Sequence, residues 1–261
     1  WLHTGLLALS LISLPIIPDV LWRPAGHEEP VTQILGLLAA TIGLPYFLLS
    51  TTGPLVQAWF ARSFPSGTVY RLFALSNFAS LLALVAYPPL IEPWIPTRTQ
   101  SLAWSGAYVA FVLLCAGAAF FSLRAASHAP SAASSEGLPD AAPPLARDYA
   151  IWLLLSAMGS YMLLAVTNHI TQNVASVPFL WILPLILYLL TFILSFEGRG
   201  WYQRRFFLGP LAVIVVAMAW GLNAGGDIME VTDAVPLFCA GLFVCCMFYH
   251  GELAGLKPAP R

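Results

Sequence analysis

Apolar residues along this chain fall into eight long runs, separated by short polar or proline-rich stretches. A helix that crosses the hydrocarbon core of a bilayer needs about 20 mostly apolar residues. The pattern therefore predicts an all-α fold, a polytopic transmembrane helical bundle with about eight crossings. The predicted crossings lie at about 5–22, 31–61, 72–91, 101–124, 149–170, 178–196, 205–223 and 234–251.

The second predicted crossing, 31–61, is longer than one straight helix needs. It contains Gly43, Pro45 and the pair Gly53-Pro54. Proline removes a backbone hydrogen bond and its ring clashes with the preceding turn. We therefore expect this segment to be kinked or broken at these residues.

The basic residues predict an orientation, because cytoplasmic loops of membrane proteins retain Lys and Arg. With eight crossings, only Arg23 and Arg98 fall on one side. The other nine of the 11 basic residues fall on the opposite, predicted cytoplasmic side: Arg62, Arg71, Arg124, Arg147, Arg199, Arg204, Arg205, Lys257 and Arg261.

Tryptophans support these boundaries, since indole rings favour the membrane–water interface. None of the nine falls in the middle of a predicted crossing. The predicted outer ends carry Trp22, Trp94, Trp104, Trp181 and Trp220, and the inner ends carry Trp1, Trp59, Trp152 and Trp201.

A segment rich in Ala, Ser and Pro, 126–147, has no apolar period and is predicted to be a flexible cytoplasmic linker. It divides the chain into a first membrane half, 1–125, and a second membrane half, 148–261. Each half contains four predicted helices.

Composition excludes several classes of function. Hydrophobic residues form 59% of the chain and charged residues 9%, whereas soluble domains carry about 25% charged residues. The net charge of -1 gives no electrostatic basis for binding nucleic acid. The four cysteines all lie in apolar runs without metal-ligand spacing, so we expect buried thiols and no metal site: Cys115, Cys239, Cys245 and Cys246.

Four segments carry a resemblance to a known family: LGLLAATIGLPYFLLSTTGPLVQAWFARS (35–63), YRLFALSNFASLLALVAYPPLIEP (70–93), TNHITQNVASVPFLWILPLILYLLTFILSFE (167–197) and YHGELAGLKPAP (249–260). They resemble bacterial membrane proteins of the fused major-facilitator/spermidine-synthase type. The most specific parts are PFLWILPLILYLLTFILSF and HGEL.

The resemblance implies a partial major-facilitator-like arrangement in the bacterial inner membrane. Such proteins usually have about two more helices before the point matching Trp1, which would complete a six-plus-six arrangement of repeats. They continue past HGEL into further helices and often a synthase-like domain. We therefore expect this chain to be the membrane portion only, without either end.

A major-facilitator-like fold would line its cavity with the fourth, seventh and tenth helices, which correspond here to 31–61, 149–170 and 234–251. Their polar side chains include Gln57, Tyr161 and Tyr249, which we predict as ligand-binding residues. Helix packing is the alternative role, because small polar side chains also join helices in lipid.

The densest polar cluster ends the crossing at 149–170: Asn168, His169, Gln172 and Asn173. On a continued helix, Asn168 faces Gln172 and His169 faces Asn173. We predict Asn168, His169 and Gln172 to contact a ligand or a lipid head group, with a hydrated interface as the alternative.

His250 and Glu252 lie near the predicted cytoplasmic end of the last crossing. Their position predicts one of two roles. They form a proton-linked pair, in which His250 also binds a ligand, or they form a docking surface. The alternative is an ordinary exposed helix end. His169 lies near the opposite face of the membrane, roughly 25–30 Å from His250 by crossing length, so one haem held by both histidines is not expected. A single-histidine pigment or haem site stays open, although we expect no cofactor.

Docking of a partner or soluble domain is predicted at Arg199, Arg204, Arg205 and Glu252.

Two functions follow as expectations. The first is a transporter-like membrane domain that binds a small neutral or amphipathic ligand. Polyamines are disfavoured, because Asp19, Glu92 and Glu252 all lie near helix ends. The second is a non-catalytic accessory or scaffold subunit of a larger membrane complex. No enzyme activity is expected, since the glycine-rich strand-to-helix turn of a nucleotide-type donor site is not found, and synthase chemistry would need a further C-terminal domain.

Overall fold

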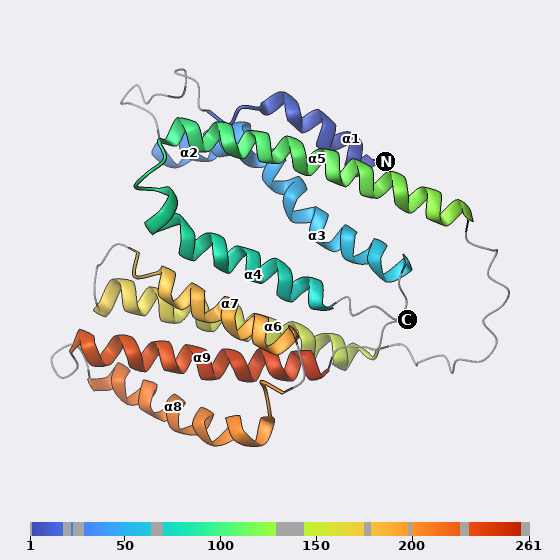
Figure 1. The fold of residues 1–261 in the computed structure, drawn as a ribbon. Helices are drawn as coiled ribbons and strands as arrows, with labels where there is room; N and C mark the ends of the chain where they lie inside the picture. Colours follow the sequence, from blue (N-terminus) through green and yellow to red (C-terminus); the bar gives the residue numbers. More distant parts are fainter. Residues whose placement is uncertain are drawn as a thin grey trace, which may run out of the picture. The chain divides into compact units, whose positions relative to one another are not determined.

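The structure is a computed structural model that describes residues 2–17, 22, 29–63, 70–128, 144–174, 179–197, 200–224 and 230–256. The described residues form helices and contain no strand (Figure 1). The α-helices are α1 (Leu2–Ser10), α2 (Pro30–Leu38), α3 (Leu44–Ser63), α4 (Tyr70–Ala86), α5 (Thr97–His128), α6 (Ala146–His169), α7 (Ile182–Glu197), α8 (Arg204–Ala224) and α9 (Val231–Gly255). Short irregular helical turns extend several of them: η1 (Leu11–Ser13), η3 (Ala39–Gly43), η4 (Tyr87–Ile91) and η5 (Ile170–Val174).

Every predicted crossing contains a described helical segment, which confirms an all-α helical bundle. Within the described ranges, six helices are long and apolar enough to cross a membrane: Pro30–Phe60, Arg71–Ile91, Thr97–Phe121, Ala146–Val174, Arg204–Asn223 and Val231–Gly255. These features are those of a multi-pass membrane protein.

The predicted count of eight crossings is not confirmed, because Leu2–Ser13 and Ile182–Glu197 are shorter. The 16 residues of α7 rise about 24 Å, less than the hydrocarbon thickness of about 30 Å. The first helical segment ends at Ser13, just before Pro15.

The helix α3 continues through Pro54, so it is not broken at Gly53-Pro54, and a kink there stays a prediction. The chain bends between α2 and α3 (Figure 1), at the π-helical turn η3, which ends at Gly43 as the sequence predicted. Pro45 follows this turn and has no N–H for the Thr41 carbonyl four residues earlier. A π-helical turn is a common way to accommodate such a lost hydrogen bond.

The chain forms two compact units, which we describe separately. Unit 1 comprises residues 1–67 and 90–139, and unit 2 comprises 68–89 and 140–261. This grouping differs from the sequence-based division, which assigned 72–91 to the first membrane half. Most of the predicted linker, 129–143, lies outside the described residues.

The core of unit 1 lies between α1, α3 and α5. Its buried residues are Leu7, Leu48, Tyr108, Val112 and Cys115. Two polar contacts join the same helices. Ser10 Oγ lies 2.7 Å from Tyr108 OH, and His3 Nε2 lies 2.9 Å from Thr52 Oγ1.

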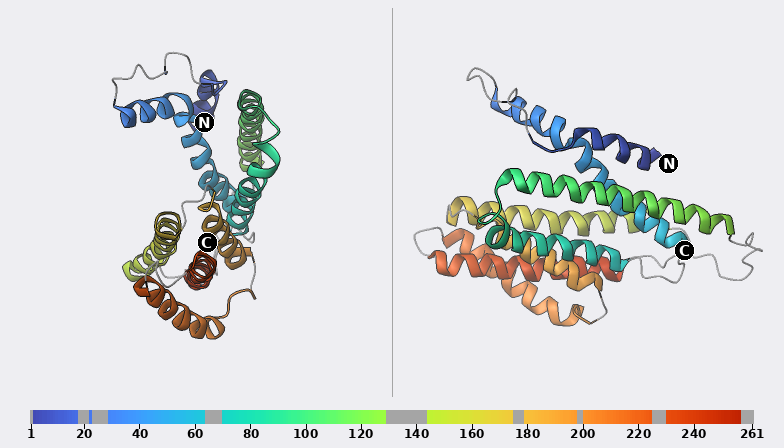
Figure 2. Two further views of the ribbon diagram at one scale, coloured as in Figure 1. Left: turned by 90° about the vertical axis from the view of Figure 1, so that its left-hand side faces the viewer. Right: turned by 45° about the horizontal axis from the view of Figure 1, so that its top comes forward.

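In unit 2, α9 packs against α6, α7 and α8, and α4 packs against α7. The views in Figure 2 show these helices running side by side. In α9, 44% of the residues in the most apolar stretch are buried, against 22% or less in the corresponding stretch of each of the other five membrane-length helices. The core around α9 consists of Val166, Ile170, Ala234, Phe238, Cys239, Leu242 and Cys246. The four cysteines are free and buried, as predicted.

Glycines let neighbouring groups approach α9 closely. A Cβ atom at Gly241 would overlap Met218 of α8, and one at Gly251 would overlap the ring of Tyr202. A flexible methionine can move aside, but a tyrosine ring cannot without leaving the α9 surface.

We expect Gly251→Ala to destabilise the protein, because the added methyl group displaces the Tyr202 ring. Overpacking of this kind costs about 1–3 kcal/mol. The matched control is Gly255→Ala on the same helix, where a Cβ meets nothing within 4 Å. Thermal unfolding in detergent, followed by size-exclusion chromatography, measures both. Equal midpoints for the two variants would contradict the packing role of Gly251.

Candidate functional site

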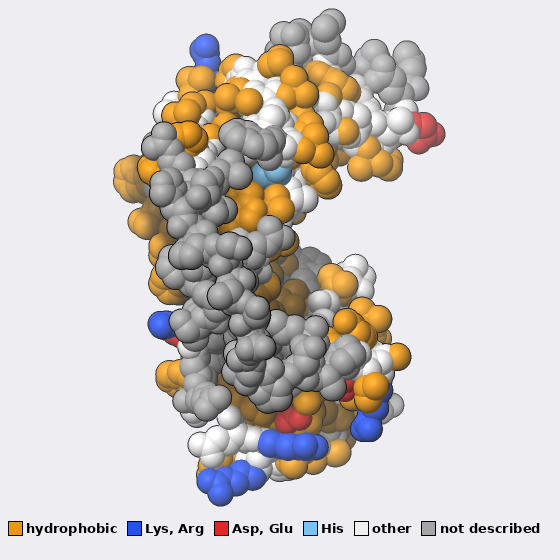
Figure 3. Space-filling view, turned by 90° about the vertical axis from the view of Figure 1, so that its right-hand side faces the viewer, with side chains coloured by type: hydrophobic (Ala, Val, Ile, Leu, Met, Phe, Trp, Pro, Cys, Tyr) orange, Lys and Arg blue, Asp and Glu red, His pale blue; other side chains and the backbone are white. Residues whose placement is uncertain are grey.

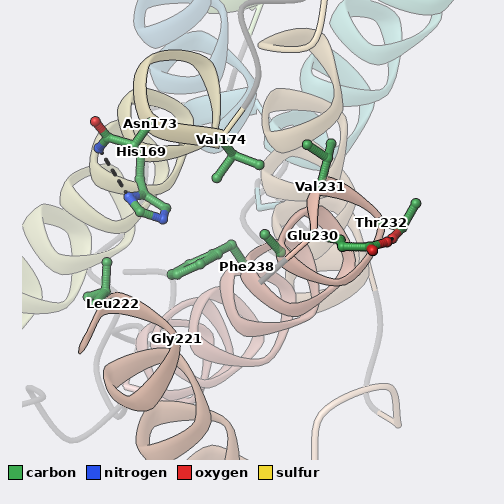
Figure 4. Close-up of a pocket in the computed structure, with 10 residues that line it drawn as sticks. His169, Asn173, Val174, Gly221, Leu222, Glu230, Val231, Thr232 and Phe238 are labelled. Carbon is green, nitrogen blue, oxygen red and sulfur yellow. Dashed lines mark hydrogen bonds between the residues drawn. The ribbon is translucent and has the colours of Figure 1, made fainter. Parts of the chain in front are cut away.

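A pocket of about 760 Å³ opens where α6 and α8 end and α9 begins. All its lining residues belong to unit 2. Figure 4 shows the ring of Phe238 between the α6 and α9 sides of the pocket. The lining residues are His169, Asn173, Val174, Gly221, Leu222, Glu230, Val231, Thr232, Ala234 and Phe238.

His169 is held in the pocket from two sides. Asn173 Nδ2 donates a hydrogen bond of 3.2 Å to His169 Nδ1, drawn as a dashed line in Figure 4. The imidazole ring also lies 4.3 Å from the ring of Phe238, centre to centre. With Nδ1 accepting, the proton of a neutral ring resides on Nε2, which is then a hydrogen-bond donor.

The first turn of α9 supplies the other polar groups. The Thr232 hydroxyl donates to Glu230 Oε2 over 3.3 Å. Among the described residues that line the pocket, Glu230 is the one carboxylate, and none is Lys or Arg. The pocket therefore combines apolar walls with uncharged hydrogen-bonding groups and a single acid.

The predicted polar cluster is divided by this geometry. The predicted pairing of His169 with Asn173 is confirmed. Asn168 and Gln172 are exposed and do not line the pocket. They lie on another side of the helix, because residues one position away point about 100° around the axis.

His250 does not lie at an exposed helix end, and that alternative is wrong. Its side chain is 1% exposed and lies between α6, α7 and α9. The rings of Tyr188 and Phe192 each pack against it at 5.0 Å. On the α6 side, a Cβ at Gly159 would lie 2.9 Å from His250 Nε2, so this approach depends on glycine.

Thr191 of α7 is the hydrogen-bond partner of His250 Nδ1. The Thr191 hydroxyl donates to the Tyr188 carbonyl over 2.8 Å. The same oxygen lies 3.1 Å from His250 Nδ1. With the hydroxyl proton directed to the Tyr188 carbonyl, Nδ1 is the donor of this second bond.

Glu252 does not pair with His250 but takes part in a separate cluster with Tyr202 and Arg204. The Tyr202 hydroxyl donates to Glu252 Oε1 over 2.6 Å, and Arg204 Nε lies 3.7 Å from the same oxygen. Burial, followed by the hydrogen bond to Glu252, raises the pKa of the Tyr202 phenol above its ordinary value. The phenol therefore stays protonated and keeps donating to the carboxylate.

The remaining predicted residues are dispersed. Gln57 is half-buried on α3 in unit 1, Tyr161 is exposed on α6, and Tyr249 is half-buried on α9. That these three side chains line one common cavity stays a prediction. Arg204 and Arg205 are exposed at the start of α8, and Arg199 lies outside the described residues.

Sequence reasoning missed Phe238, Glu230, Thr191, Gly159 and Tyr202. Thr191 had a visible signal, since it is the one aliphatic hydroxyl, Ser or Thr, within the apolar run 182–194. Phe238 and Gly159 had none, because nothing in their local sequence distinguishes them from packing residues.

Comparisons with known proteins found no match among family models, curated proteins or solved structures.

We expect Thr191→Val to lower stability, because His250 Nδ1 loses its acceptor in a buried site. An unsatisfied buried polar group costs about 1–3 kcal/mol. Ser195→Ala on the same helix is the control, since its hydroxyl donates a weak hydrogen bond of 4.0 Å to Met247 Sδ. The measurement is the thermal midpoint in detergent. A Thr191→Val midpoint no lower than that of Ser195→Ala would contradict the assigned hydrogen bond.

Proposed function

We propose that this chain is the membrane domain of a transporter-like protein that binds a small neutral or amphipathic molecule. Its four segments similar to fused major-facilitator/spermidine-synthase proteins support this identity. The observation that carries the binding proposal is the pocket between His169 and Phe238.

The lining of the pocket suits a molecule with one polar end. Leu222 and Val231 offer exposed apolar surface, and the nearly buried ring of Phe238 lies against His169. His169, Asn173 and Thr232 offer hydrogen-bonding groups at its edge. Small-molecule sites typically combine apolar walls with a few placed polar groups in this way.

Charge narrows the ligand class. A polyvalent cation would require several carboxylates, and Glu230 alone lines the described part of the pocket. An anion would meet this carboxylate without a Lys or Arg beside it among the described lining residues. A neutral ligand avoids both costs.

The orientation follows from the basic residues of unit 2. Arg147 begins α6, whereas His169 ends it, and 22 residues of helix separate them by roughly 33 Å. Under the positive-inside rule the Arg147 end is cytoplasmic and the pocket faces outward. Together with the resemblance to bacterial membrane proteins, this orientation supports our proposal of a bacterial inner-membrane location, with the 126–147 linker and the C-terminal end in the cytoplasm.

One observation favours the alternative, an accessory subunit of a larger membrane complex. Further along the two helices, away from the pocket, α6 and α9 touch directly: Cys246 Sγ lies 3.8 Å from the Gly159 carbonyl oxygen. Close packing there leaves the pocket at one end of the two helices. Transport would require these helices to separate, whereas a static binding subunit would not.

Equilibrium binding of a radiolabelled monoacylglycerol, a neutral amphipathic probe, tests the proposal on the purified chain. We expect Phe238→Ala to weaken binding by tenfold or more, about 1.4 kcal/mol, because the ring of Phe238, which is 2% exposed, holds the His169 imidazole at the pocket. We expect Glu230→Gln to leave the affinity unchanged. The control is Phe121→Ala, which alters an exposed ring of unit 1.

Two results would contradict the proposal. One is monoacylglycerol binding that Phe238→Ala does not change. The other is micromolar binding of spermidine that is lost in Glu230→Gln, which would identify a cationic ligand. Uptake of the bound probe into proteoliposomes separates a transporter from an accessory subunit.

A further inference from the structure

The end of unit 2 opposite the pocket gathers arginines from two helices. The Trp152 indole nitrogen donates to the Leu256 carbonyl over 3.1 Å, which holds the start of α6 against the end of α9. The contact of Arg204 with Glu252 holds the start of α8 against the same end of α9. Arg147, Arg204 and Arg205 are therefore brought to one end of the bundle, and all three are exposed.

The guanidinium groups of α8 are already ordered by contacts within the protein. Arg204 is held through Nε by Glu252, yet its side chain stays 66% exposed. Arg205 stacks over Phe206, with its guanidinium carbon 4.8 Å from the ring centre. Arg205 Nη2 also donates to Gln203 Oε1 over 3.4 Å. Ordered cations bind an anion at a smaller entropic cost than free ones.

Aromatic side chains at the same position indicate the edge of a bilayer. Trp201 is 63% exposed and Phe206 is 62% exposed. The membrane-length helix Arg204–Asn223 begins between them. Exposed aromatic rings beside arginines at the end of such a helix are typical of the head-group region.

The surface next to the arginines is apolar. Leu208, Val213, Val215 and Val216 of α8 are all exposed. In the space-filling view, Lys and Arg side chains gather near acidic ones at the lower end, among hydrophobic side chains (Figure 3). A ligand that matches this surface has an anionic group joined to a long apolar part.

We propose that Arg204 and Arg205 bind the phosphate of an anionic phospholipid, whose acyl chains lie along the exposed face of α8. Guanidinium groups bind phosphate oxygens through charge-assisted, often paired hydrogen bonds. Trp201 and Phe206 flank the head group at the interface. The acyl chains of a lipid require an apolar surface next to the arginines, which the exposed face of α8 provides. A protein partner that binds the arginines would not require this surface.

Native mass spectrometry of the full chain in detergent tests this site. The chain is titrated with phosphatidylglycerol and, in parallel, with phosphatidylcholine of the same acyl chains. We expect preferential retention of phosphatidylglycerol. Removal of both charges in R204Q/R205Q should weaken phosphatidylglycerol binding about fivefold for each arginine.

Matched variants separate charge from folding. The R204K/R205K variant keeps both charges and should retain most of the preference for phosphatidylglycerol, whereas R98Q, at the start of α5, should behave like the wild type.

Equal retention of the two lipids, or unchanged binding in R204Q/R205Q, would overturn the proposal. So would glycerol 3-phosphate that competes as well as the intact lipid, which would indicate a soluble phosphate ligand. A protein that co-purifies with the wild type and is lost in R204Q/R205Q, without any change in lipid binding, would assign the arginines to a partner instead.

Discussion

The fold of unit 2 depends on the burial of α9 among α6, α7 and α8. In lipid, helices gain little from hydrophobic association, so close packing and satisfied polar groups must hold them together. Gly241 and Gly251 allow neighbouring side chains to rest on the α9 backbone. His250, the most polar buried group of this helix, bonds to Thr191 of α7 and faces Gly159 of α6. One side chain thus ties the central helix to two of its neighbours.

The two ends of α9 then acquire different chemistry. At its start, Glu230 before the helix and Phe238 in its second turn line one amphipathic pocket together with His169. Its last turns bring Glu252 next to Tyr202 and Arg204. We propose ligand binding at the first end and anionic lipid at the second. Both proposals need α9 to stay fixed within the bundle, because each site includes side chains from a neighbouring helix.

Much of the fold follows from local pattern, while the sites depend on contacts between distant residues. The apolar runs locate every helix, and the pairing of His169 with Asn173 follows from helical spacing. The burial of His250 could not be foreseen, because it requires Gly159 and Thr191, 91 and 59 residues away. Of the kink or break expected at Gly53-Pro54, no break occurs, since an apolar helix in lipid tolerates proline when the surrounding backbone bonds are kept. The count of eight crossings is not confirmed, because α7 is shorter than its flanking apolar residues suggest.

Photolabelling of the protein in liposomes with an apolar diazirine reagent tests the burial of α9 most directly. The reagent labels lipid-exposed side chains, and mass spectrometry of peptides locates the label. The account predicts labelling at Val213 and Val216 of α8, which are about 70% exposed, and protection of Leu242, Cys245 and Cys246. Labelling of these three α9 residues as strong as that of α8 would contradict α9 as the buried helix around which unit 2 is built.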